Sequence, residues 1–182
     1  MNNKGLSNQS NIAIKKAGPY NKAQKPMLTE YQKAILDLSD MNKAGGILAR
    51  FMVPGRVICL NGPLGAGKST LARSMIGTCC AGLDDIPSPT FTLVQPYQAD
   101  AGFEIWHMDL YRLNRPDEAL ALGIEEAFFE ASCLIEWPDK IAEFLPQNTL
   151  HIHIDFADGN QSRHLRLAGQ QQLISDIAGL VG

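Results

Sequence analysis

The sequence lacks several features that would define its class at once. No apolar run approaches the roughly 18 residues that a membrane-spanning helix needs. The four cysteines, of which Cys79 and Cys80 are adjacent, show neither a metal-ligand spacing nor a secreted disulfide framework. A net charge of −3 disfavours a protein that holds nucleic acid mainly through its own electrostatic surface. With 182 residues, the chain suits one domain, and we expect it in the cytoplasm with no membrane contact.

The first 26 residues differ from the rest in composition. They hold five lysines and no acidic residue, with few large apolar side chains and no periodicity. We interpret residues 1–26 as a disordered basic tail. A targeting peptide is the alternative, but the segment has no apolar core for secretion and no arginine typical of a mitochondrial presequence.

A glycine-rich turn separates an apolar run from an amphipathic segment. Its residues Gly62, Gly67, Lys68 and Ser69 meet the pattern G-x-x-x-x-G-K-[ST]. Residues 56–60 before it are typical of a buried strand, and apolar residues recur at helical spacing after it. Glycines allow successive backbone N–H groups to converge on phosphate oxygens, and the helix start adds its positive end. The segment therefore predicts a phosphate-binding P-loop, and residues 27–182 are expected to form a single P-loop ATPase domain.

The predicted ligands are ATP and Mg²⁺. In such a loop the lysine places its charge on the β- and γ-phosphates, and the hydroxyl that follows enters the coordination shell of Mg²⁺. No [NT]-K-x-D guanine motif occurs in the chain, which weakens a GTPase interpretation. Thr90, on a proline-stiffened turn, is expected to sense the γ-phosphate. The expected nucleotide-binding residues are Gly62, Gly65, Ala66, Gly67, Lys68, Ser69, Thr70 and Thr90.

Two acidic residues end apolar, strand-like segments. Glu136 follows Leu134 and Ile135, which is the apolar-apolar-acid arrangement of a Walker B strand, and Asp109 ends an earlier segment. In an open α/β sheet, ligands bind outside the carboxyl ends of the strands. We therefore assign Glu136, together with Ser69, to Mg²⁺. Asp109 is assigned to orienting or deprotonating water at the γ-phosphate, so that Asp109 and Lys68 are the expected catalytic residues.

Two neighbours of these acids have more than one interpretation. Arg112 fits a cis arginine finger that stabilises developing charge, and it fits equally an ion pair with Asp117 or Glu118. Trp137 favours packing over stacking on a base.

The coarse pattern of elements predicts an α/β fold. We expect a three-layer P-loop NTPase-type sheet whose centre is mostly parallel and which carries antiparallel strand pairs. Ser39 is the expected N-cap of the helix before the P-loop, which would run to Met52. Expected strands are 31–38, 56–60, a strand entered near 90–94, 103–110, 133–137, 150–156 and 164–167. Further helices are expected after the P-loop, from 116 to 131 with a break at Gly123, from 138 to 145, and from 171 onward.

Four ordered motifs carry a family resemblance. Residues 62–71, 88–94, 107–112 and 135–138 read GPLGAGKSTL, SPTFTLV, HMDLYR and IEWP. Together they resemble the signatures of the bacterial TsaE (YjeE) ATPases, over about residues 36–168. The usual acid after the first glycine is Pro63 here, and the usual threonine after the lysine is Ser69, which keeps the hydroxyl.

The resemblance implies a function. That family is a small P-loop ATPase needed to make N6-threonylcarbamoyladenosine at position 37 of tRNAs. By resemblance, the chain would bind ATP and Mg²⁺, dock on the TsaD–TsaB heterodimer, and meet tRNA only through that complex. The family's lysine and hydroxyl fall on Lys68 and Ser69, its magnesium acid on Glu136, and its catalytic aspartate on Asp109.

Two other classes of function stay open. A small-molecule kinase is permitted by the P-loop, but it needs an acceptor pocket and usually a lid with several arginines, and only Arg115 occurs between residues 113 and 162. A non-hydrolysing module, in which ATP only prepares the fold for a partner, is the third possibility.

Overall fold

One seven-stranded sheet organises the molecule. The computed structural model describes residues 29–35 and 37–181. The strand order is β1-β7-β6-β2-β5-β4-β3. The strands are β1 (Thr29–Ile35), β2 (Val57–Asn61), β3 (Val94–Gln98), β4 (Glu104–Asp109), β5 (Ser132–Glu136), β6 (Leu150–Ala157) and β7 (Ser162–Gly169). The helices are α1 (Leu38–Ala49), α2 (Lys68–Cys79), α3 (Asp117–Leu120), α4 (Ile124–Glu130) and α5 (Gln171–Val181), with 3-10 turns η1 (Pro138–Ile141) and η2 (Asp158–Asn160).

The centre of the sheet is parallel and its two sides are antiparallel. Strands β6, β2, β5 and β4 run parallel to one another. The pairs β1–β7, β6–β7 and β3–β4 are antiparallel. The expected mixed α/β fold, with its parallel centre and antiparallel pairs, is confirmed.

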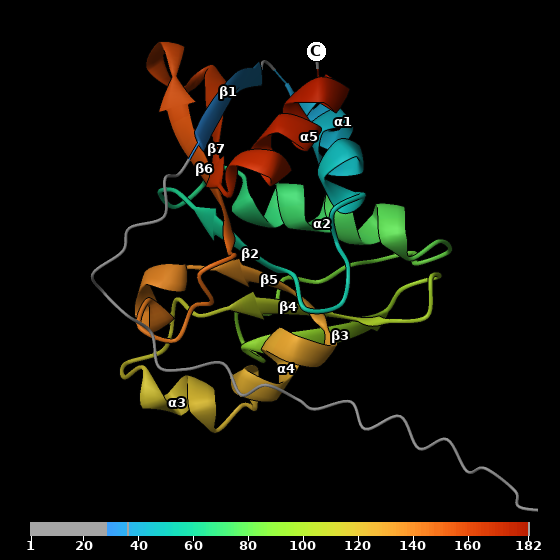
Figure 1. The fold of residues 1–182 in the computed structure, drawn as a ribbon. Helices are drawn as coiled ribbons and strands as arrows, with labels where there is room; N and C mark the ends of the chain where they lie inside the picture. Colours follow the sequence, from blue (N-terminus) through green and yellow to red (C-terminus); the bar gives the residue numbers. More distant parts are fainter. Residues whose placement is uncertain (1–28, 36, 182) are drawn as a thin grey trace, which may run out of the picture.

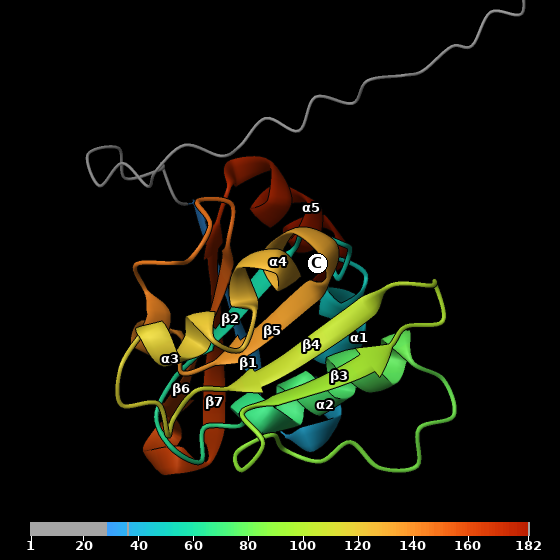
Figure 2. The same ribbon diagram turned by 90° about the horizontal axis from the view of Figure 1, so that it is seen from below.

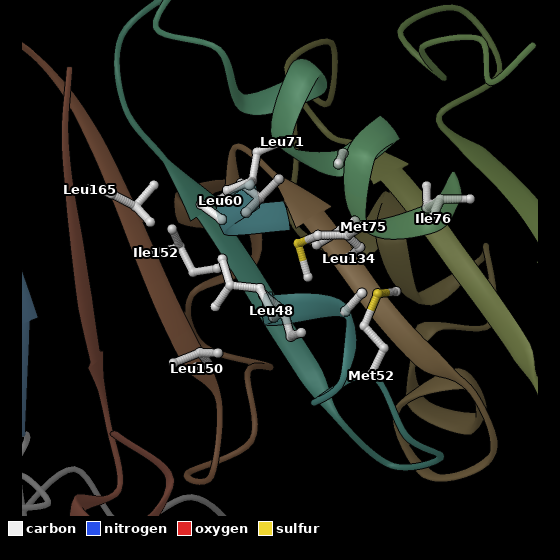
Figure 3. Packing of buried hydrophobic residues seen from close by; sticks show 14 of the residues in the cluster. Leu48, Met52, Leu60, Leu71, Met75, Ile76, Leu134, Leu150, Ile152 and Leu165 are labelled. Carbon is white, nitrogen blue, oxygen red and sulfur yellow. The ribbon is translucent and has the colours of Figure 1, made fainter. Parts of the chain in front are cut away.

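Helices cover both faces of the sheet (Figure 1). Helices α1, α2 and α5 pack on one face, and α3 and α4 lie on the other. In the view from below, α2 and α4 lie on opposite sides of β4 and β5 (Figure 2). Each face has its own hydrophobic core. The larger core joins α1, α2 and α5 to the sheet, and labelled members of it appear in Figure 3. Strands buried on both faces read as continuous apolar runs, which is why β2 and β5 could be recognised.

Helices α1 and α2 pack closely because Gly45 has no side chain. A Cβ added to Gly45 would lie 2.3 Å from Ser74 Oγ on α2. In isolation, a glycine inside a helix costs about 1 kcal/mol relative to alanine. Here it permits the approach that holds α1 against the helix of the P-loop.

Predicted boundaries of three elements are wrong, and α1 ends at Ala49 instead of Met52. The N-cap of α1 is Asp37 rather than Ser39, because the Asp37 carboxylate accepts a hydrogen bond from the backbone N–H of Asp40 at 2.8 Å. Strand β1 accordingly ends at Ile35 instead of residue 38. The helix expected over 138–145 is only the 3-10 turn η1. The bonds from Lys140 N to Trp137 O and from Phe144 N to Ile141 O span three residues, so an α-helix does not form there.

Within residues 29–35 and 37–181, no helix is long and apolar enough to cross a membrane. The basic tail predicted for residues 1–26 lies outside the described residues.

Candidate functional site

The glycine-rich loop follows the carboxyl end of β2 and leads into α2. Gly62, Gly65 and Gly67 have positive φ angles of 143°, 78° and 111°, where a side chain would be strained. A Cβ on Gly62 would also lie 2.3 Å from the carbonyl oxygen of Ile154 in β6. The backbone angle therefore favours glycine at all three positions, and Gly62 is also required by space because the loop passes close to the neighbouring strand β6.

Lys68 is the first residue of α2 and is 5% exposed. Its Nζ donates hydrogen bonds to the carbonyl oxygens of Gly62 at 2.8 Å and Pro63 at 2.9 Å. The same ammonium lies 4.0 Å from the centroid of the Trp137 ring. Burial lowers the pKa of Lys68, and the nearby Glu136 and Asp109 oppose that shift. A desolvated positive charge is thus placed at the loop, where a phosphate would be attracted to it.

Glu136 ends β5 and is 2% exposed. Its Oε2 accepts a hydrogen bond from Ser69 Oγ at 2.8 Å, and its Oε1 lies 3.0 Å from His107 Nε2. Hydroxyl and carboxylate oxygens are the hard ligands that Mg²⁺ prefers, and Mg²⁺ usually takes few ligands from protein beside waters and phosphate oxygens. The Ser69–Glu136 pair fits that donor set. Among the residues that the structure describes, no group of three or more His, Cys, Asp or Glu side chains is arranged to hold a metal ion.

Asp109 ends β4 and lies beside Glu136 in the register of the parallel pair β4–β5. It is 5% exposed. Its Oδ2 accepts a hydrogen bond from Thr90 Oγ1 at 2.5 Å, and its Oδ1 accepts one from the backbone N–H of Tyr111 at 3.1 Å. Thr90 belongs to the turn that precedes β3, and the backbone N–H of Asp109 also donates to the carbonyl oxygen of Leu93 in that turn at 3.0 Å. Asp109 therefore connects this turn to the end of β4 through both its carboxylate and its backbone.

A cavity of about 330 Å³ lies between the loop and the two strand ends. It brings together predicted site residues from four separate segments of the chain. They are Gly65, Gly67, Lys68, Ser69, Thr70, Thr90, Asp109 and Glu136, joined by Leu64, Tyr111 and Trp137.

Two predicted binding residues do not line this cavity. The carbonyl of Gly62 instead accepts from Lys68. Ala66 is 1% exposed and lines a second cavity of about 270 Å³ on the other side of the loop. The two cavities share Gly65, Gly67 and Thr70, so they adjoin at the loop.

The second cavity contains residues that the sequence did not indicate. Asp37 and Met41 come from the start of α1, and Arg163 comes from β7. The Arg163 Nε donates to the carbonyl oxygen of Ala66 at 3.1 Å, which connects β7 to the loop. No sequence motif marks these residues, because only the folded sheet brings the start of α1 and β7 to the loop.

Arg112 and Trp137 both contact aromatic rings. Arg115, rather than Arg112, pairs with Asp117. The Arg112 guanidinium lies 4.2 Å from the centroid of the exposed Phe91 ring, and Arg112 is not among the residues that line the cavity. Trp137 packs against Tyr111, with ring centroids 5.0 Å apart, and also lines the cavity.

His107 is a functional candidate that the sequence reasoning missed. Alternation along β4 places Ile105, His107 and Asp109 on one face, and this pattern is the signal that could have identified it. Its side chain is fully buried and touches the carboxylate of Glu136.

The chain matches a known family over most of its length. Residues 35–165 match the family described as "Threonylcarbamoyl adenosine biosynthesis protein TsaE". The chain is 42% identical over 123 residues to a Haemophilus influenzae protein named "tRNA threonylcarbamoyladenosine biosynthesis protein TsaE", an alignment that covers 66% of this chain and 75% of that one. The Bacillus subtilis protein of the same name is 39% identical over 123 residues, covering 65% and 73%. Among solved structures, "Crystal structure of Bacillus subtilus YdiB" is similar with a TM-score of 0.70 and 27% identity, covering 87% of this chain and 100% of that one.

Proposed function

The chain belongs to the TsaE family, and from this premise we propose that it is a Mg²⁺-dependent ATPase that supports the threonylcarbamoyladenosine modification of tRNA. The observation that carries the proposal is the 330 Å³ cavity, in which Lys68, Ser69, Asp109 and Glu136 from the P-loop, β4 and β5 face one space. A lysine, a hydroxyl and two carboxylates around a phosphate-binding loop are the parts that phosphoryl transfer to water requires.

Binding of the triphosphate rests on the loop and on Lys68. Backbone N–H groups of the loop and of the first turn of α2 approach the phosphate oxygens, aided by the positive end of the helix. The Lys68 ammonium exchanges its contacts with the carbonyls of Gly62 and Pro63 for contacts with phosphate. Ser69 and Glu136 hold Mg²⁺, which when bound neutralises charge on the β- and γ-phosphates.

The nucleoside belongs in the second cavity. The two cavities meet at Gly65, Gly67 and Thr70, so a triphosphate on the loop leaves the rest of the nucleotide beside Met41 and Arg163. Apolar contact from Met41 and polar groups from neighbouring segments suit a base and a ribose.

Hydrolysis rests on Asp109. A water molecule held by the Asp109 carboxylate attacks the γ-phosphorus and gives a proton to that carboxylate. The bond from that phosphorus to the β–γ bridging oxygen breaks, its electron pair stays on ADP, and ADP and phosphate leave. Both carboxylate oxygens of Asp109 already have donors, in Thr90 and in the N–H of Tyr111. These contacts fix the direction of the carboxylate, and Thr90 connects its position to the turn that would meet the γ-phosphate.

The partner proposed is the TsaD–TsaB heterodimer, with tRNA reached only through that complex. Large exposed side chains support a partner at this surface: Leu64 and Tyr111, which line the cavity, are 78% and 53% exposed, and Phe91, which follows the lining residue Thr90, is 81% exposed. A partner covering this surface could change the rate of hydrolysis by direct contact. A location in the cytoplasm belongs to the same proposal.

The experiment measures phosphate release from ATP by the full chain, with and without TsaD–TsaB. We expect slow Mg²⁺-dependent hydrolysis by the chain alone and faster hydrolysis with the heterodimer. In a reconstituted modification reaction that lacks only its ATPase, the chain should restore threonylcarbamoyladenosine. Equal hydrolysis rates in both conditions, or transfer of phosphate to a metabolite instead of water, would contradict the proposal.

A further inference from the structure

A buried histidine contacts Glu136, the acidic residue of the proposed metal site. His107 lies in β4, has no exposed surface, and faces the same side of the sheet as Asp109. Its Nε2 is 3.0 Å from Glu136 Oε1. Its Nδ1 has no hydrogen-bond partner among the residues that the structure describes.

The direction of each hydrogen bond around Glu136 follows from its chemistry. A carboxylate only accepts, so His107 Nε2 must carry the proton that it shares with Oε1. Ser69 Oγ likewise donates its single proton to Oε2. The remaining lone pairs of the Ser69 oxygen then stay available to a metal ion. The two oxygens of Glu136 thus have separate donors, one in the sheet and one at the cavity.

We infer that His107 is a positioning residue that holds the Glu136 carboxylate, and through it the Ser69 hydroxyl, in the orientation that receives Mg²⁺. This inference rests on the proposed function. A glutamate side chain has three rotatable bonds, and a hydrogen bond from Ser69 alone would let the carboxylate turn as Ser69 adjusts to the metal. The contact with His107 fixes the other oxygen from inside the protein.

Packing alone does not account for a histidine at this position. A leucine would fill buried space beside Ile105 without any polar atom, whereas His107 leaves Nδ1 buried without a described partner. A buried polar atom without a partner costs about 1–3 kcal/mol. A polar side chain retained at that cost, with its other nitrogen on the proposed metal ligand, is what an orienting role requires.

The test compares two amide variants of the full chain. In His107→Gln the amide nitrogen reaches about as far as Nε2, and in His107→Asn it reaches only as far as Nδ1. ADP affinity is measured by calorimetry without Mg²⁺ and across a Mg²⁺ titration. We expect His107→Asn to bind Mg²⁺-free ADP as the wild type does and to lose roughly 10–100-fold in Mg²⁺ affinity. His107→Gln should restore the wild-type response.

The other possible results overturn either the inference or the proposed function. A wild-type Mg²⁺ response in His107→Asn, or an equal loss in both variants, overturns the inference. A loss of Mg²⁺-free ADP binding in His107→Asn would also overturn it, because His107 would then support the loop and not the metal ligands. If His107→Asn does not melt cooperatively, His107→Leu replaces it under the same expectations. If the wild-type chain itself binds no ADP, the proposed function fails instead, and the two failures are distinguishable.

Discussion

The bodies of the four parallel strands and the carboxyl ends of β4 and β5 are both buried, but they differ in chemistry. Ile58, Ile105, Leu134 and Leu150, one from each strand, have no exposed surface and contribute apolar side chains to the larger core. At the carboxyl ends, charged residues are buried instead: Asp109 and Glu136 end β4 and β5, and Lys68 follows the loop after β2. Burial of apolar surface stabilises the fold, whereas burial of charge costs free energy that hydrogen bonds must offset.

This difference separates stability from chemistry along the same strands. We expect changes in the strand bodies to lower the free energy of unfolding and to spare nucleotide binding. Changes at the strand ends should weaken the binding of nucleotide or Mg²⁺ and spare the free energy of unfolding. Each prediction below tests one side of that separation.

The largest expected effect is on stability. Leu150→Ala at the start of β6 should lower the free energy of unfolding by about 2–5 kcal/mol, because a fully buried leucine leaves a cavity. The matched change Leu83→Ala, at a residue that is 44% exposed, should stay within about 0.5 kcal/mol. Urea unfolding measures both. ADP affinity, measured at low temperature where both variants are folded, should equal that of the wild type.

Lys68→Ala tests the prediction for the charged residues near the strand ends. Loss of the ammonium should weaken ATP binding by about 1.5–3 kcal/mol, or roughly 10–150-fold, because a hydrogen bond to a charged group is lost. Hydrolysis should cease. Lys43→Ala, at a lysine whose side chain is 72% exposed on α1, is the control and should bind ATP normally. Calorimetry gives both affinities, and unchanged binding by Lys68→Ala would remove the lysine from the phosphate site.

Glu136→Gln keeps the shape of the side chain and removes its charge. We expect Mg²⁺ affinity in the presence of ADP to fall roughly 10–100-fold, with Mg²⁺-free ADP binding preserved. Glu130→Gln, at an exposed position on α4, serves as the matched control. A Mg²⁺ titration followed by calorimetry compares the two. Equal Mg²⁺ affinities in Glu136→Gln and Glu130→Gln would show that Glu136 does not contribute to metal binding.

The smallest effect is expected where charges are fully exposed. A hydrogen bond and ion pair with Arg115 lower the pKa of Asp117, so any contribution of the pair to stability would be present at neutral pH and lost as the pH falls through that pKa. Both side chains are more than half exposed, and solvent screens the pair. Asp117→Asn should therefore leave the urea midpoint unchanged at neutral and acidic pH. A clear loss at neutral pH that disappears in acid would contradict this.

The fold and the loop were predictable because their signals are local. The P-loop strand, glycine turn and helix are contiguous, and the apolar runs of β2 and β5 report burial on both faces. Asp109 and Glu136 could be placed at one edge of the sheet because both end strands, and the register of β4 and β5 does bring them side by side. Their catalytic and metal-binding roles stay predictions.

The remaining features depend on contacts between distant segments. His107 meets Glu136 across 29 positions, and Arg163 meets Ala66 across 97, so no local pattern reveals either contact. The helix expected after Pro138 is replaced by hydrogen bonds that span three residues instead of four, and no local pattern in the sequence distinguishes such a 3-10 turn from a short α-helix. Ser39 and Asp37 are both good N-cap residues, and only the structure decides between them.

The central claim is that residues at the carboxyl ends of these strands hydrolyse ATP. Its most direct test is the rate of phosphate release by Asp109→Asn. The rate is measured at saturating ATP and Mg²⁺ with TsaD–TsaB present, after calorimetry has shown that the variant binds ATP as the wild type does. We predict that the rate falls by about 10²–10⁴-fold, the usual contribution of a positioned base. A wild-type rate in Asp109→Asn would contradict the account.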